Sequence, residues 1–137
     1  MTVLDLPVAR AREQLKSVLD AADAGVPTTI VRAGRRVAVV DAALLRALLS
    51  HSVPADVQLV HEAGEWAAFV PGMPLSGTGP SSSAAIDDLV AALREYADDW
   101  TDHLRHAPNH REAWGLVQLI ELSSDDELRS WITGAGA

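Results

Sequence analysis

The chain of 137 residues contains no cysteine, which excludes a disulfide framework, a zinc finger, an iron–sulfur site and thiol chemistry. Long hydrophobic runs are also missing, since no apolar stretch approaches the roughly 18–20 residues that span a bilayer. The first ten residues, MTVLDLPVAR, lack a basic stretch followed by an apolar one, so no signal peptide is expected. These absences predict a cytoplasmic protein with no membrane partner.

Positive charge is scarce and unevenly distributed. The chain has 11 Lys+Arg against 19 Asp+Glu, which excludes a uniformly basic nucleic-acid coat. Residues 1–52 carry seven basic and five acidic residues, whereas residues 53–137 carry four basic and fourteen acidic ones. This asymmetry indicates two functions, only one of which suits an anionic partner. The alternative is that the acidic surface serves solubility alone.

The first half has the pattern of a small β-α-β-β-α module. We expect a strand over residues 1–4, a helix from Pro7 to about Gly25, and a helix over Ala42–Ser50. Thr28–Arg32 and Arg35–Val40 predict a hairpin around Ala33-Gly34, and residues 37–40 are apolar enough to be covered on both faces. Apolar residues in the first helix recur at helical spacing: Val8, Ala11, Leu15, Val18, Leu19 and Ala22. Such a small module buries little surface, so it should pair with a copy of itself or lean on the second half.

The second half, residues 53–137, follows a linker at 51–56 and predicts the order β-β-α-β-α. A hairpin of Val57–Glu62 and Glu65–Val70 surrounds Ala63-Gly64, and a further short strand is expected near Leu75–Gly77. Ser81 is the expected N-cap of a long amphipathic helix that ends before Pro108. Residues 115–122 predict a strand, and Ser123 or Ser124 should cap a last helix to about Ile132. The fold class is α+β, with domains at 1–52 and 53–137.

No set of residues points to catalysis, so we expect no enzyme and no cofactor. Ser81–Ser83 have no His or Asp placed to activate them. His103, His106 and His110 have a spacing that suits zinc or nickel on an uninterrupted helix, but Pro108 lies within the run. We expect solvated residues at a helix end, with a metal-dependent hydrolase as a minor alternative.

Two segments of the first half resemble the amino-terminal domain of the Phd/YefM (prevent-host-death) antitoxins. They are Ala11-Arg12-Glu13-Gln14-Leu15 and, downstream, Thr29-Ile30-Val31-Arg32-Ala33-Gly34-Arg35-Arg36-Val37-Ala38-Val39-Val40. The resemblance covers about 50 residues and implies a dimer that binds operator DNA, with Arg12 and Arg32 on the family's two basic positions. Arg10, Arg35 and Arg36 are added as candidate DNA contacts on charge and location. The alternative is that Arg12, on the shoulder of the apolar stripe, covers the core instead.

The second half is similar in pattern to a HicB-type antitoxin domain. The segment Glu65-Trp66-Ala67-Ala68-Phe69-Val70-Pro71-Gly72-Met73-Pro74 resembles its aromatic strand, and Gly79-Pro80-Ser81 stands where that family has a capped helix start. The acidic residues of that second motif are absent here. The resemblance implies a half that binds a toxin protein, through the acid-rich face of the long helix or through one of the four tryptophans.

Together these features predict a type II antitoxin that neutralises a cognate toxin and represses its own operon. The toxin would be RelE/ParE-like or Doc-like by association with the family, and the antitoxin a homodimer or higher oligomer on a palindromic operator. The alternative is a small dimeric protein-interaction module that never binds DNA. Salt separates the two, because affinity for DNA falls steeply as the salt concentration rises.

Overall fold

The computed structural model describes residues 5–134, so the strand predicted at residues 1–4 lies outside the described part. The chain divides into two compact units, Met1–Ala47 and Leu48–Ala137. The division falls inside helix α3 (Ala42–Ser52), which is longer than the predicted Ala42–Ser50, and the functional domains at 1–52 and 53–137 stay a prediction. Each unit is described by itself below.

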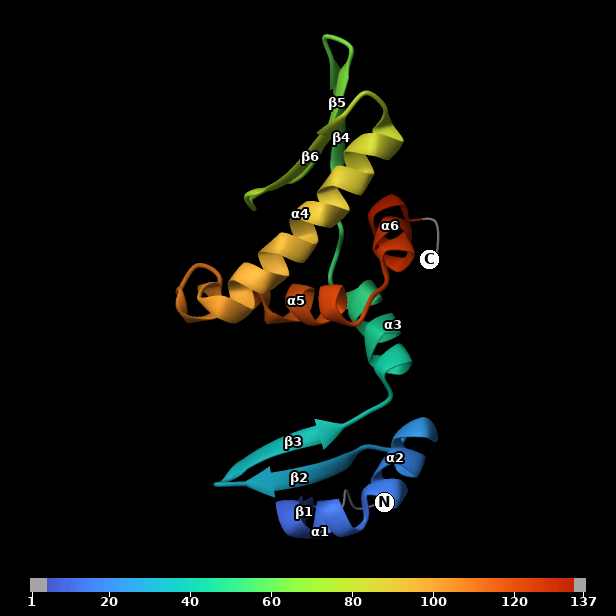
Figure 1. Ribbon diagram of the computed structural model, residues 1–137, viewed down its shortest axis with the longest axis vertical. Coiled ribbons are helices and arrows are strands. Elements are labelled where there is room, and N and C mark those ends of the chain that lie inside the picture. Colours follow the sequence, from blue (N-terminus) through green and yellow to red (C-terminus); the bar gives the residue numbers. More distant parts are fainter. Residues whose placement is uncertain (1–4, 135–137) are drawn as a thin grey trace. The chain divides into compact units, whose positions relative to one another are not determined.

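The first unit is a three-stranded sheet with two helices (Figure 1). Its elements are β1 (Asp5–Pro7), α1 (Val8–Glu13), α2 (Leu15–Asp23), β2 (Thr28–Arg32) and β3 (Arg35–Val39), followed by α3. The strand order is β1-β2-β3, with β1 parallel and β3 antiparallel to the central β2. The turn between β2 and β3 is Ala33-Gly34, as predicted, and its φ values of 50° and 78° are those of a tight two-residue hairpin turn.

The prediction of one continuous first helix is wrong. Gln14, at φ −109° and ψ 24°, separates α1 from α2, and the chain changes direction there. The predicted apolar stripe is consequently divided: Ala11 and Val18 are buried, whereas Leu15 and Leu19 are 54% and 52% exposed. A change of direction in the middle of a stripe turns part of it away from the sheet.

Within residues 5–47, the first unit has a small buried cluster. Leu6, Ala11 and Val18 are buried together, and Ile30 and Val39 pack against them. The expectation that residues 37–40 are covered on both faces is wrong for this chain, because Val37 is 60% and Val40 42% exposed. The helices cover the sheet over its buried cluster only, which leaves apolar side chains of the first unit in solvent.

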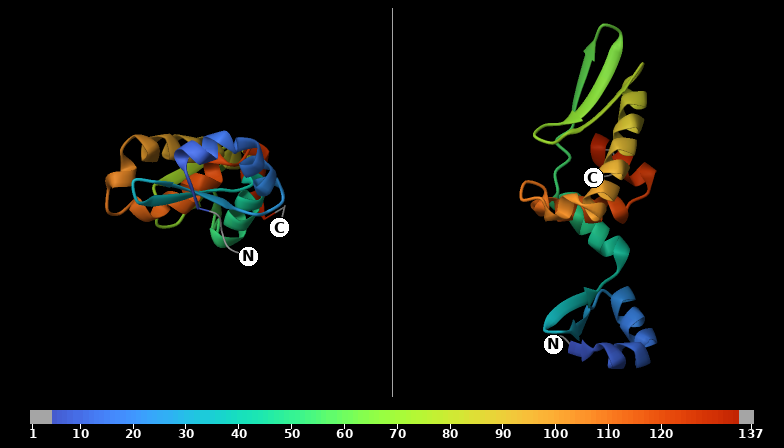
Figure 2. Two further views of the ribbon diagram at one scale, coloured as in Figure 1. Left: turned by 90° about the horizontal axis from the view of Figure 1, so that it is seen from below. Right: turned by 60° about the vertical axis from the view of Figure 1, so that its left-hand side comes forward.

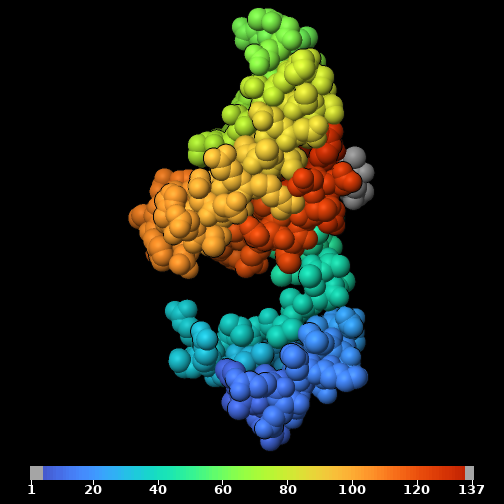
Figure 3. Space-filling model, in the orientation of Figure 1, coloured from blue at the N-terminus to red at the C-terminus, as the bar shows by residue number. Residues whose placement is uncertain are grey.

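The second unit is a three-stranded antiparallel sheet covered by a long helix (Figure 2). Its elements are β4 (Gln58–Glu62), β5 (Glu65–Val70), β6 (Leu75–Gly79), α4 (Ser82–Asp102), two short 3₁₀ helices η1 (Leu104–His106) and η2 (Arg111–Ala113), α5 (Trp114–Glu121) and α6 (Asp125–Thr133). The strand expected near Leu75–Gly77 is present as β6. In the space-filling view α4 and α6 lie side by side (Figure 3).

Two glycines allow α4 to lie close to β6. A Cβ atom at Gly77 would overlap the backbone of Leu89 and Ala85, and one at Gly79 would lie 2.6 Å from the Ala84 Cβ. The backbone N–H of Thr78, between these glycines, donates to the Asp88 carboxylate of α4 at 2.9 Å. The strand thus touches the helix backbone directly, with no side chain between them.

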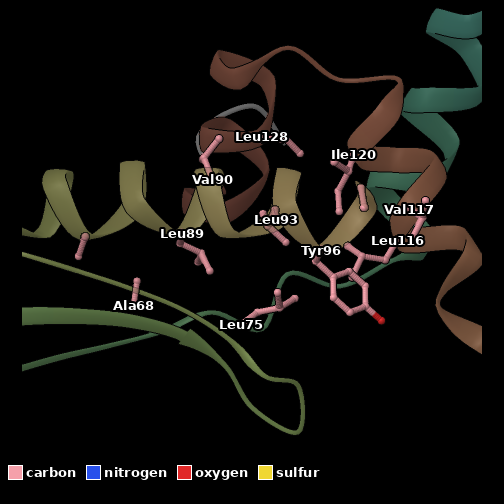
Figure 4. Packing of buried hydrophobic residues seen from close by; sticks show 12 residues of the cluster. Ala68, Leu75, Leu89, Val90, Leu93, Tyr96, Leu116, Val117, Ile120 and Leu128 are labelled. Carbon is pink, nitrogen blue, oxygen red and sulfur yellow. The ribbon is translucent and has the colours of Figure 1, made fainter. Parts of the chain in front are cut away.

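The main core of the molecule lies beneath α4 (Figure 4). Its fully buried large side chains come from α4, α5 and α6: Leu89, Leu93, Ile120 and Leu128. Ser81 caps α4, as predicted, by accepting from the Ala84 N–H at 3.1 Å. Ser124 caps α6 in a reciprocal capping box with Glu127.

The strand predicted at residues 115–122 is a helix, α5. Leu116, Val117, Leu119 and Ile120 are buried, whereas Gln118 and Glu121 are exposed. That spacing is helical, but a short apolar run does not distinguish a buried helix from a buried strand by hydrophobicity alone. The order of the second unit is therefore β-β-β-α-α-α, not the predicted β-β-α-β-α.

Candidate nucleic-acid interface

All five candidate arginines are exposed in the first unit. Arg10 and Arg12 lie in the last turn of α1, on either side of the buried Ala11. Arg32 and Arg35 flank the Ala33-Gly34 turn and stand opposite each other across the hairpin. Both roles considered for Arg12, a DNA contact and cover for the core, leave its charged group in solvent, so both stay predictions.

The structure separates Arg36 from the other two hairpin arginines. Arg36 pairs with Val31, and since side chains alternate along a strand, it lies on the opposite face from Arg32 and Arg35. On that face its guanidinium donates to the Asp5 carboxylate at 2.9 and 3.2 Å. The charge of Arg36 is therefore already paired, which the sequence pattern did not indicate.

Asp5 also accepts a hydrogen bond from the Thr29 hydroxyl, on the neighbouring strand β2. This hydrogen bond first, and the Arg36 guanidinium second, hold the pKa of Asp5 below its usual value of 3.8. The carboxylate thus joins all three strands of the sheet through side chains.

Acidification should weaken this contact. Because the pKa of Asp5 is lower in the folded chain, its contribution to stability is fully present above pH 3.8 and is lost as the pH falls through the folded value. Thermal unfolding followed against pH should show a smaller acid-induced loss in Asp5→Asn than in the unmodified chain. An equal loss in both proteins would mean that Asp5 contributes nothing to the acid sensitivity.

The remaining four arginines lie on two elements of the first unit, helix α1 and the tip of the β2–β3 hairpin. β1 runs parallel to β2 and its last residue, Pro7, pairs with Val31, one residue before Arg32. Helix α1 starts directly after Pro7, so it begins beside the hairpin tip. Arg10, Arg12, Arg32 and Arg35 form what we call the arginine group.

Exposed apolar side chains also concentrate in the first unit and in α3. Of eleven large hydrophobic residues that are exposed in the described chain, eight fall between residues 8 and 48. They are Val8, Leu15, Leu19, Val26, Val37, Val40, Leu44 and Leu48. The sequence pattern placed Leu15 and Leu19 in the core, and only the break at Gln14 reveals them as surface residues.

The outer face of α4 is acidic. Glu95, Asp98, Asp99 and Asp102 are exposed along it. Arg94, which precedes Glu95 in the sequence, donates to the carbonyls of Ile120 and Ser123 at 2.7 and 2.6 Å and to the Asp125 carboxylate at 2.9 Å. Because Arg94 is bound to the α5–α6 region, it does not neutralise the outer face of α4.

Of the three histidines, His110 packs against the end of α4. The His110 ring nitrogen Nδ1 and the Tyr96 hydroxyl share a hydrogen bond of 2.8 Å. The backbone carbonyl of His110 accepts a second hydrogen bond, of 2.9 Å, from the Trp100 indole. His103 and His106 are exposed on the turns that follow the helix. Within residues 5–134 no group of three or more His, Asp or Glu side chains is arranged to hold a metal ion.

Three of the four tryptophans pack partly against the main core, namely Trp66, Trp100 and Trp131. Trp131 also donates to the Val53 carbonyl at 2.9 Å. Trp114 is 52% exposed at the start of α5. Over the described residues, no helix combines the length and the apolar character needed to cross a bilayer.

Comparison with known proteins identifies the family. A family model described as antitoxin of toxin-antitoxin, RelE / RelB, TA system, and called PHD-like, matches residues 1–134. The crystal structure of an antitoxin part of a toxin/antitoxin system from Syntrophomonas wolfei subsp. wolfei shares the fold, with a TM-score of 0.77, 20% sequence identity and 96% of each chain covered. No curated protein matches the chain.

The family match confirms the predicted Phd-type relationship, and it extends over both units. The HicB-like resemblance of residues 53–137 is not supported by these comparisons and stays a prediction. Antitoxins of this kind are not enzymes, which confirms that expectation. The chain belongs to the PHD-like family of antitoxins of type II toxin–antitoxin systems.

Proposed function

We propose that this antitoxin binds operator DNA as a homodimer through its first unit, represses its own operon, and holds its toxin through its second unit. The observation that carries the proposal is the arginine group, exposed on α1 and at the hairpin tip of a unit whose net charge is positive, in a chain that is otherwise strongly acidic. An anionic partner would be attracted to the first unit and repelled by the acidic second unit.

The exposed apolar surface supports the homodimer. Leu15 and Leu19 lie one turn apart on α2, as Leu44 and Leu48 do on α3, so each helix presents an apolar strip. A unit with so small a core gains stability when a second copy covers these strips. A two-fold dimer would also place two arginine groups on a palindromic site.

The chemistry of the arginine group suits DNA. The planar guanidinium can bind phosphate oxygens or guanine edges through two hydrogen bonds. Two copies of the group approach the roughly 6–10 phosphate contacts of a strongly salt-dependent binder. Arg36 is a weaker candidate, since Asp5 competes with phosphate for its guanidinium.

An operator-binding experiment tests the proposal. The affinity of the full chain for the DNA upstream of its own gene should fall by orders of magnitude between about 50 and 200 mM salt. Binding at no salt concentration would favour the alternative function, a dimeric protein-interaction module. The chain's net charge of −8 is the observation that favours this alternative.

The outer face of α4 is our candidate for the toxin contact, with a basic RelE-type toxin as the partner. Reversing two of its charges in the variant Asp98→Lys/Asp99→Lys should weaken toxin binding at least about tenfold, or about 1.4 kcal/mol. The measurement is calorimetric titration with the toxin encoded beside this gene. Glu121→Lys, an exposed acid of α5, serves as the matched control and should keep the affinity. Equal affinities for all three proteins would place the toxin on another surface.

A further inference from the structure

Within residues 5–134, strand β4 is an uncovered edge of the second sheet. In the order β4-β5-β6 its one neighbour in that part of the chain is β5, and all five of its residues are exposed. Leu59 and Val60 are 44% and 43% exposed. Among the described residues after Leu48, three large hydrophobic side chains are exposed, and these are Leu59, Val60 and Trp114. Long exposed edges with apolar side chains are the places where another strand pairs.

The turn geometry shows which backbone groups of β4 are available. A two-residue turn closes on a hydrogen-bonded pair, here Glu62 and Glu65 around Ala63-Gly64. Hydrogen-bonded and non-hydrogen-bonded pairs alternate along an antiparallel ladder. The backbone N–H and C=O of Val60, two residues before Glu62, therefore also point towards β5. The N–H and C=O groups of Leu59 and His61 therefore point out from the free edge.

We propose that the β4 strands of two copies of this antitoxin pair antiparallel about a two-fold axis at Val60, which joins two three-stranded sheets into one of six strands. In this register Leu59 of each copy faces His61 of the other, so the outward backbone groups meet as hydrogen-bonded pairs. Val60 faces Val60 across the axis as a non-bonded pair. The partner is a second copy of this chain, and the inference does not depend on DNA binding.

The side chains of β4 complement themselves in this register. Gln58 of each copy faces Glu62 of the other, so an amide meets a carboxylate and no like charges stand directly opposite. The β-branched valine pair at the centre is favourable in sheets. His61 is held flat against Trp66, with ring centroids 4.4 Å apart, so its side chain is already ordered for the contact.

The two neighbouring registers that also align outward backbone groups are poorer. Shifting the centre to Leu59 sets Glu62 opposite Asp56, which opposes two carboxylates. Shifting it to His61 sets Val60 opposite Glu62 and two imidazoles opposite each other. Asp56 itself has a left-handed φ of 47°, so β4 does not continue before Val57 in extended form.

A disulfide trap tests the pairing, because the chain has no cysteine of its own. In a non-bonded antiparallel pair the Cα atoms are ~4.5 Å apart, within the range that a disulfide bridges. Full-length Val60→Cys under mild oxidation should therefore convert to a covalent dimer, seen as a doubling of mass without reductant. Thr78→Cys is the matched control: it is exposed on the same sheet face, on the opposite edge strand β6, and should stay monomeric in mass.

A second pair of variants tests the register. Gln58→Cys and Glu62→Cys should cross-link to each other when mixed, and each much less with itself. Adding Leu59→Pro to Val60→Cys should largely prevent the cross-link, since it removes an outward N–H while leaving the β4–β5 ladder intact. An unchanged thermal midpoint would show that this variant still folds.

Three results would overturn the proposal. They are a Val60→Cys chain that stays uncross-linked, equal cross-linking by Thr78→Cys, and a Leu59→Pro variant that is folded and cross-links as before. If Leu59→Pro instead lowers only the affinity for the toxin, the edge belongs to the toxin and the self-pairing is wrong.

Discussion

Arg12→Ala or Arg32→Ala should abolish binding of operator DNA at physiological salt, while the fold and toxin binding remain intact. Each substitution acts twice in a dimer, and a well-formed arginine contact contributes about 1–3 kcal/mol. Because both side chains are exposed, their removal should change the free energy of unfolding by no more than about 0.5 kcal/mol. Electrophoretic mobility shifts with the DNA upstream of the gene give the affinity.

Two other arginines provide the comparison for this experiment. Arg111→Ala removes an exposed arginine of the second unit and should leave DNA affinity unchanged. Arg36→Ala should have a smaller effect than Arg12→Ala or Arg32→Ala, because its guanidinium is paired with Asp5. If the Arg12 and Arg32 variants still shift operator DNA normally, the arginine group is not the DNA contact.

Gly77→Ala should unfold or severely loosen the second unit and thereby end toxin binding. The added methyl group would overlap the backbone of Leu89 and Ala85, which cannot move aside as a flexible side chain could. The cost is at the upper end of overpacking, about 3 kcal/mol or more. Chemical denaturation, followed through tryptophan fluorescence, measures it.

Gly115→Ala is the matched control for that substitution. Gly115 lies in α5, and an added Cβ would meet the Val53 Cγ2 atom at 3.6 Å, an ordinary contact. Alanine favours helix over glycine by up to about 1 kcal/mol, so this variant should be as stable as the parent or more so. A Gly77→Ala chain of parental stability would mean that the close contact of α4 with β6 is not needed.

Much of the local structure follows from the sequence where one signal dominates. Both Ala-Gly turns and the Ser81 cap are where turn and capping chemistry predict them. Helix α5 was predicted as a strand because its four buried residues are all apolar. Its two polar residues, Gln118 and Glu121, are too few to distinguish a helical from a strand-like hydrophobic repeat. In that segment only the packing under α4 decides between the two forms.

The sequence predicted which residues belong to the candidate site, but it did not predict how they are arranged. The sequence pattern placed five arginines in the first unit, and the structure finds all of them exposed. It gave no sign that Arg36 is bound to Asp5, because that contact joins residues 31 positions apart through the register of three strands. The exposure of Leu15 and Leu19 was missed for a similar reason, since a break at one residue redirects the whole of α2.

The small core of the first unit has a consequence for how long the chain survives. Among the described residues, the buried cluster of the first unit has three members, Leu6, Ala11 and Val18, whereas the cluster of the second unit is much larger. Since association stabilises only the associated form, dilution should open the first unit long before the second. A protease that cleaves opened segments would then degrade the antitoxin fastest when the antitoxin concentration is low. The concentration of the antitoxin would thus determine the lifetime of the antitoxin.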